Sequence, residues 1–212
     1  MAHSTAVHAA DPAHLDTSTG VDNRKLAFWT FIGSECLLFG SLIASYMAYK
    51  GSSRTGPYPH DTVLADGTLV PGILDVPLTS ISTAVLLFSS LFMVLGLAGV
   101  QRGDRKSGAL WLAATALFGS IFLGFQVYEF THFWHNGLTL SSNLFGSTFF
   151  MLTGFHGAHV LAGVLYMSTL ATLVWTGRLG KDKSLNVEIG GLYWHFVDVV
   201  WIIIFPLIYL IP

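Results

Sequence analysis

The sequence predicts an all-α integral membrane protein, a bundle of five transmembrane helices with the N-terminus inside and the C-terminus outside. Two observations predict this class. The 212-residue chain is 52% hydrophobic and only 10% charged, far more apolar than a soluble domain. It also contains five long apolar segments without lysine or arginine, as transmembrane helices do. These segments are residues 26–49, 78–100, 108–130, 144–175 and 187–211.

The lengths of the segments suit a bilayer. Residues 26–49 would form a helix about 36 Å long at 1.5 Å per residue, which is enough to cross the membrane. Residues 144–175 make a longer segment of 32 residues. We expect this helix to project beyond the hydrocarbon or to bend at Gly154 or Gly157.

The basic residues predict the orientation. Eight of the ten lie in residues 23–25, 101–106 and 178–183, which five spans place on one side of the membrane. Basic loops stay in the cytoplasm, so we expect Pro212 outside. We expect residues 1–23 to form a disordered polar cytoplasmic tail, since they lack the features of a signal peptide. Residues 24–212 then form the transmembrane domain of a multi-pass protein of the cell membrane.

Charge and cysteine content exclude several classes of protein. The formal charge is −2 and the basic residues form no patch, so no nucleic-acid partner is expected. Cys36 is the single cysteine, which rules out a disulfide framework or a cysteine metal site within one chain. The outer loop, residues 50–77, is rich in glycine and proline and too polar to span a membrane. We expect it to form an ordered cap over neighbouring protein.

Glu35 lies near the middle of the first segment. An ionised side chain at the bilayer centre costs about 2.5 to 3.5 kcal/mol on insertion scales, so such a residue normally faces protein and pairs with something. Two interpretations stay open. Glu35 is either a proton relay in a cleft between helices, or a protonated carboxyl that holds two helices together.

The fourth segment carries two histidines three residues apart, His156 and His159. They could bind a metal if His195 supplied a third ligand, or a haem between opposing helices. In the alternative interpretation each imidazole bonds a carbonyl or a carboxylate such as Asp198 or Glu188. A ridge of small residues at spacing four lies beside them and would permit close approach of another helix. The ridge is Gly154, Ala158 and Ala162.

The last segment contains His195 and Asp198, which share one face of a helix. With Glu188 they are predicted to be structural, buried polar residues. Asp198 belongs to a stripe with Trp194, Trp201 and Phe205, and we expect this stripe to pack on protein. At the outer end of the third segment, His132 and His135 are expected to join an interfacial aromatic belt.

The order of these motifs resembles subunit III of the haem-copper oxidases, the cytochrome c oxidase subunit III family, in its five-span bacterial form. The matches run collinearly over about residues 24–212. They are residues 31–39 (FIGSECLLF), 76–78 (VPL), 102–106 (RGDRK), 145–150 (FGSTFF), 153–160 (TGFHGAHV) and 193–201 (YWHFVDVVW).

The resemblance implies a non-catalytic, lipid-binding subunit of a proton-pumping cytochrome c oxidase, which passes electrons to oxygen in aerobic respiration. It implies that partner subunits I and II hold haem and copper, and that this chain carries no cofactor except bound phospholipid. It also implies that the chain stabilises subunit I and sustains proton uptake and oxygen access. Glu35, His156 and His159 match the lipid cleft of the family, and Arg178 and Lys181 fall where cations could hold lipid phosphate.

Three alternatives remain open at the level of the sequence. The same fold could serve a quinol oxidase or a nitric-oxide-reductase accessory protein of the same superfamily. A free-standing proton-coupled transporter would use Glu35 and Asp198. A b-type cytochrome would use the histidines as haem ligands.

Overall fold

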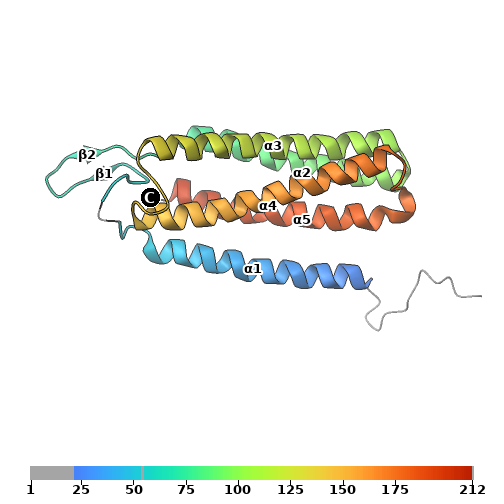
Figure 1. Cartoon of the computed structure of the whole chain (residues 1–212), viewed down its shortest axis with the longest axis horizontal. Coiled ribbons are helices and arrows are strands. Elements are labelled where there is room, and N and C mark those ends of the chain that lie inside the picture. Colours follow the sequence, from blue (N-terminus) through green and yellow to red (C-terminus); the bar gives the residue numbers. More distant parts are fainter. Residues whose placement is uncertain (1–21, 54, 212) are drawn as a thin grey trace, which may run out of the picture.

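The computed structural model describes residues 22–53 and 55–211. Residues 1–21, most of the predicted tail, lie outside this part. Five helices long and apolar enough to cross a membrane are present among the described residues, which confirms the predicted all-α five-span fold (Figure 1). They are α1 (Asn23–Tyr49), α2 (Val76–Arg102), α3 (Arg105–His135), α4 (Leu144–Trp175) and α5 (Ser184–Phe205). A short 3-10 helix, η1 (Lys181–Lys183), precedes α5, and a π-helical turn, η2 (Pro206–Leu210), follows it.

Capping residues set where four of the helices begin. The side chains of Asp22, Asp75, Asp104 and Asn143 each accept a hydrogen bond from a backbone N–H in the first turn of the following helix. Helices α1, α2 and α3 therefore start two or three residues before the predicted spans, while α4 has the predicted bounds. As an unbroken helix of 32 residues, α4 is about 48 Å long and exceeds a hydrocarbon core of about 30 Å.

Helices α2 to α5 form a bundle, and α1 lies at its edge against α4 and α5 (Figure 1). Glycines allow the close approaches within the bundle. A Cβ on Gly99 of α2 would lie 2.7 Å from the backbone nitrogen of Gly108 on α3. A Cβ on Gly119 would lie 2.4 Å from the ring of Trp194, which is fully buried. The bundle core is thus built around one large side chain and the space that glycine leaves for it.

The predicted ridge on α4 does not mediate helix approach among the described residues. Gly154 has open space beside it, and Ala158 and Ala162 are exposed. The neighbouring face packs instead, because Gly157 contacts Gln126 of α3 and Gly163 contacts Trp194 of α5. Small residues of α4 do meet other helices, as predicted. Within this chain, however, they lie on a different face of α4 from the predicted ridge.

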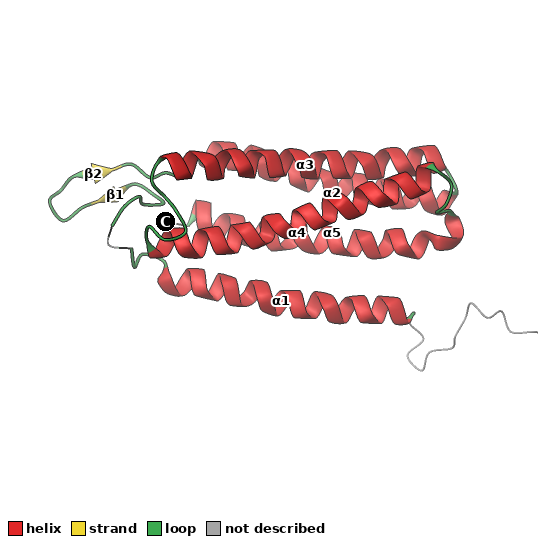
Figure 2. Ribbon diagram, viewed as in Figure 1, coloured by secondary structure: helices red, strands yellow, loops and turns green. Residues whose placement is uncertain are grey.

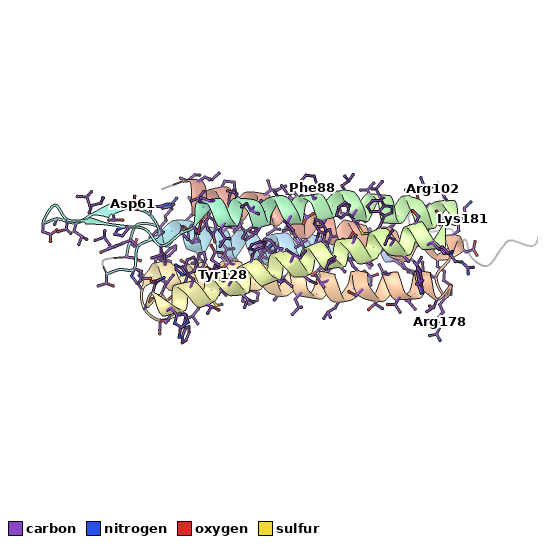
Figure 3. The ribbon with its side chains drawn as sticks, turned by 90° about the horizontal axis from the view of Figure 1, so that it is seen from above. Asp61, Phe88, Arg102, Tyr128, Arg178 and Lys181 are labelled. Atoms are coloured by element: carbon purple, nitrogen blue, oxygen red, sulfur yellow. The ribbon has the colours of Figure 1, made fainter. Side chains whose placement is uncertain are left out.

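The outer loop contains a short antiparallel hairpin of β1 (Thr62–Val63) and β2 (Leu69–Val70), shown as the strands in Figure 2. It lies at the opposite end of the bundle from Arg102, Arg178 and Lys181, as Figure 3 shows for Asp61. The loop also contacts η2, since the ring Nε2 of His60 lies 3.2 Å from the carbonyl oxygen of Ile208.

Candidate functional site

The central contact of the candidate site joins α1 to α4. Oε2 of Glu35 lies 3.1 Å from Nε2 of His159, and only 15% and 17% of the two side chains are exposed. The other ring nitrogen, Nδ1, lies 2.7 Å from the carbonyl oxygen of Phe155 and must therefore carry a hydrogen. The contact between Nε2 and Oε2 then requires one further proton, held by the imidazole or by the carboxyl. The pair is chemically able to hold one exchangeable proton within the membrane.

Aromatic side chains from α1 and α5 contact the His159 side of this pair. The Phe39 ring of α1 lies 5.0 Å from the His159 ring, edge to face. The hydroxyl of Tyr193 on α5 donates a 3.0 Å hydrogen bond to the backbone carbonyl of His159. Such low-polarity surroundings strengthen the interaction within the pair and make loss of either partner costly.

His156, three residues earlier on α4, has different surroundings. It is completely buried and stacks on the Trp201 ring at 4.7 Å, with Phe122 and Phe39 edge-on. Neither ring nitrogen has a hydrogen-bond partner among the described residues. His156 therefore belongs to the bundle core, whereas His159 faces α1.

A second contact between charged groups ties α1 to α5 near the basic end of the bundle. The ammonium of Lys25 lies 2.7 Å from Oε1 of Glu188. Glu188 was predicted to be buried, but 37% of its side chain is exposed, because it lies near the start of α5 where lysine can reach it. An ion pair this exposed contributes little to stability.

His195 and Asp198 meet through a residue that sequence analysis missed. The hydroxyl of Ser90 on α2 donates to Oδ2 of Asp198 and lies 3.1 Å from Nδ1 of His195. Asp198 is buried as predicted, but His195 is only partly buried because it borders a small cavity with Met93 of α2. The predicted packing of the stripe is confirmed, since Trp194 and Trp201 are buried and donate to Ser89 and Thr83 of α2.

Glu129 is another polar residue that sequence analysis did not single out. It is buried in α3, where its carboxyl contacts Thr79 of α2 and Tyr209 of η2. The sequence could have indicated Glu129, because it is a carboxyl within a lysine-free span and lies three residues from the polar Gln126.

The remaining predicted residues lie at the two ends of the bundle. Arg178 and Lys181 are exposed at the same end of the bundle as Arg102 (Figure 3). His132 and His135 are exposed in the last turn of α3, where an interfacial position was expected. His156, His159 and His195, considered above as one possible metal set, do not come together, and no group of three potential metal ligands occurs among residues 22–53 and 55–211.

Five apolar helices with paired polar groups between them define a polytopic integral membrane protein. Comparison with known sequences identifies its family. The sequence model of the family "Cytochrome c oxidase subunit III" matches residues 12–211. The chain belongs to the cytochrome c oxidase subunit III family. This family supplies one subunit of haem-copper oxidase complexes, which are oxidoreductases, so the chain has other oxidase subunits as partners and is a multi-pass protein of the cell membrane.

Relatives include subunits of oxidases with different names. The chain is 38% identical over 189 residues to cytochrome c oxidase subunit 3 of Bacillus subtilis, covering 89% of this chain and 86% of the relative. It is 34% identical over 210 residues to quinol oxidase subunit 3 of the same organism, covering 99% and 97%. Cytochrome bo(3) ubiquinol oxidase subunit 3 of Pseudomonas aeruginosa is 32% identical over 208 residues, covering 98% and 94%.

Proposed function

We propose that the chain is the non-catalytic subunit III of a proton-pumping cytochrome c oxidase, where it stabilises subunit I and sustains proton uptake and oxygen access. One observation carries this proposal. Inside the spans, Glu35 of α1 contacts His159 of α4, and Asp198 and His195 of α5 both contact the Ser90 hydroxyl of α2. Groups used in this way join helices and hold protons, while electron transfer falls to the haem and copper of subunits I and II.

We further propose that phospholipid covers the outer surface of α1. Only Phe39 and Tyr46 are buried in this helix, and Leu37 and Trp29 are 77% and 55% exposed. A contiguous apolar surface of this kind is covered by lipid or protein. The exposed cations Arg178 and Lys181 lie at the end of the bundle where α1 begins, so they suit the phosphate of such a lipid. By the positive-inside rule, this end is the cytoplasmic one.

Our proposal also specifies cytochrome c as the electron donor of the complex. Relatives named for cytochrome c and for quinol have similar identities to this chain, so a quinol oxidase is the second candidate. Neither donor would contact subunit III, since electrons enter the complex at other subunits.

The experiment is purification of the tagged chain in mild detergent, with identification of the co-purifying subunits and measurement of oxygen consumption. Our proposal predicts that subunits I and II co-purify and that reduced cytochrome c supports oxygen consumption. Activity with quinol alone would establish the second candidate. Recovery of the chain without any oxidase subunit would contradict both.

A further inference from the structure

A second buried carboxyl, far from the Glu35 pair, joins three elements near the end of the bundle that carries the outer loop. Glu129 of α3 is 7% exposed. Its Oε1 lies 2.9 Å from the hydroxyl of Thr79 on α2. Its Oε2 lies 2.9 Å from the hydroxyl of Tyr209 on η2. Each carboxyl oxygen thus contacts one hydroxyl, from a different element.

The hydrogens available to these contacts can be counted. The Thr79 hydroxyl has one proton and lies near two oxygens, since the carbonyl of Asp75 is 2.8 Å away. The Asp75 carbonyl already accepts from the backbone N–H of Thr79 at 3.1 Å, so the hydroxyl proton can go either to Asp75 or to Glu129. When it goes to Asp75, the contact between Thr79 and Glu129 takes its proton from the carboxyl. Tyr209 has a single phenolic proton, which it donates to Oε2.

The charges around the carboxyl point the same way. The two ion pairs among the described residues do not include Glu129. The titratable groups that face it are Asp75, from the start of α2, and Tyr209, from η2. Its other neighbours in a small adjoining cavity, among them Gln126 and Thr153, are uncharged. An ionised carboxylate buried without a cation is strongly unfavourable, because it loses hydration and gains no opposite charge.

We infer that Glu129 is a proton-binding site, a carboxylic acid that keeps its proton at neutral pH and donates it to Thr79. The hydrogen bonds then run in one direction. Tyr209 donates to Glu129, Glu129 donates to Thr79, and Thr79 donates to the carbonyl of Asp75. Each hydroxyl in this series of hydrogen bonds donates its single proton to the next group. The proton on Glu129 thus completes a hydrogen-bonded connection from η2 through α3 to α2.

Infrared difference spectroscopy of the purified oxidase complex at pH 7 tests this inference. Subtracting the spectrum of Glu129→Gln from that of the unmodified complex should leave the C=O band of one protonated carboxyl. Tyr209→Phe should keep that band but move it to higher frequency, because the carbonyl loses its hydrogen bond. The matched control is Glu188→Gln, which removes a carboxyl paired with Lys25 and should give carboxylate bands instead.

The outcomes separate the two states of Glu129. Carboxylate bands in the Glu129→Gln difference would overturn the inference, and would mean that Thr79 shares its one proton between two acceptors. An unshifted carboxyl band in Tyr209→Phe would also overturn it. If Glu129→Gln does not assemble, the Tyr209→Phe complex still tests the inference. This variant retains the Glu129 carboxyl, and the frequency shift is measured on the C=O band of that carboxyl.

Discussion

The carboxyl of Glu35 and the imidazole of His159 lie 3.1 Å apart, and they join the least buried helix to the bundle. Two other polar contacts hold α1 at different depths. Lys25 pairs with Glu188 of α5 near the start of α1. Just after its end, the ammonium of Lys50 lies 2.7 Å from the carbonyl oxygen of Ile211, next to η2. Because α1 buries so little apolar surface, these contacts define how it lies against α4 and α5.

Replacing the central acid tests its proposed role in the complex. In Glu35→Ala we expect an unchanged haem spectrum, because no haem contacts this chain in our proposal. We also expect a shorter working lifetime or less retained phospholipid, because α1 loses its attachment to α4. The measurements are the number of turnovers before inactivation and the lipid phosphorus of the purified complex. Ser34→Ala is the control, since its hydroxyl bonds a carbonyl of its own helix. Immediate loss of haem would contradict the prediction.

The tight contact around Trp194 predicts opposite effects for two glycines of α3. In Gly119→Ala the added methyl would overlap the Trp194 ring, and we expect a loss of about 1–3 kcal/mol in the free energy of unfolding. Gly124 has open space beside it, so Gly124→Ala should be neutral or stabilise by up to about 1 kcal/mol through helix propensity. Thermal unfolding of the two variants in one detergent makes the comparison. Equal Tm values would show that Gly119 is not closely packed.

The exposed ion pair at the start of α1 should be weak and sensitive to salt. A double-mutant cycle of Lys25→Met and Glu188→Gln should give a coupling of about 0.2–1 kcal/mol, because both side chains are about one-third exposed. The coupling should fall as salt rises, since mobile ions screen exposed charges. Thermal unfolding of the four proteins at low and high salt measures it. A coupling unaffected by salt would mean that the pair is shielded by another part of the complex.

Loss of the serine hydroxyl between His195 and Asp198 should cost stability. In Ser90→Ala both groups lose a shared partner while Asp198 remains buried, so we expect a loss of about 1–3 kcal/mol. Ser80→Ala is the matched control on α2, where an exposed serine bonds the carbonyl of Val76. Tm values of the two variants give the result. A smaller decrease for Ser90→Ala than for Ser80→Ala would contradict the contact.

The isolated chain should be colourless. Purified without the other subunits, it should show no Soret band, because the haem of the complex is proposed to reside in subunit I. A stoichiometric haem band, with His156 or His195 required for it, would instead support a b-type cytochrome.

Much of the fold could be predicted from hydropathy and charge. The bounds of α4 agree with prediction, and α1, α2 and α3 begin two or three residues earlier than predicted because of capping turns. These turns begin at Asp22, Asp75 and Asp104, whose side chains bond backbone N–H groups that hydropathy does not consider. Hydropathy gives the depth of a residue in the membrane, and the helical period gives which residues share a face.

Neither quantity gives the partner of a buried group on another helix. His159 meets Glu35, which lies 124 positions away, whereas Asp198 and Glu188 had been considered as carboxylate partners for it. Ser90 and Thr79 are ordinary serine and threonine in the sequence, and only the packing of α2 against α5 and α3 brings them to acids. The facing direction of α4 was also missed, because spacing identifies a ridge of small residues without saying which side of it meets a helix.

The contacts of α1 have a consequence for how the protein is made. Chains are synthesised from the N-terminus at about 5–20 residues per second, so the 124 positions from Glu35 to His159 take about 6 to 25 s. During this interval α1 is in the membrane while the partners of Lys25, Glu35 and Lys50 have yet to leave the ribosome. Until α4 and α5 have been made, α1 therefore lacks the groups that contact Glu35, Lys25 and Lys50 in the finished protein.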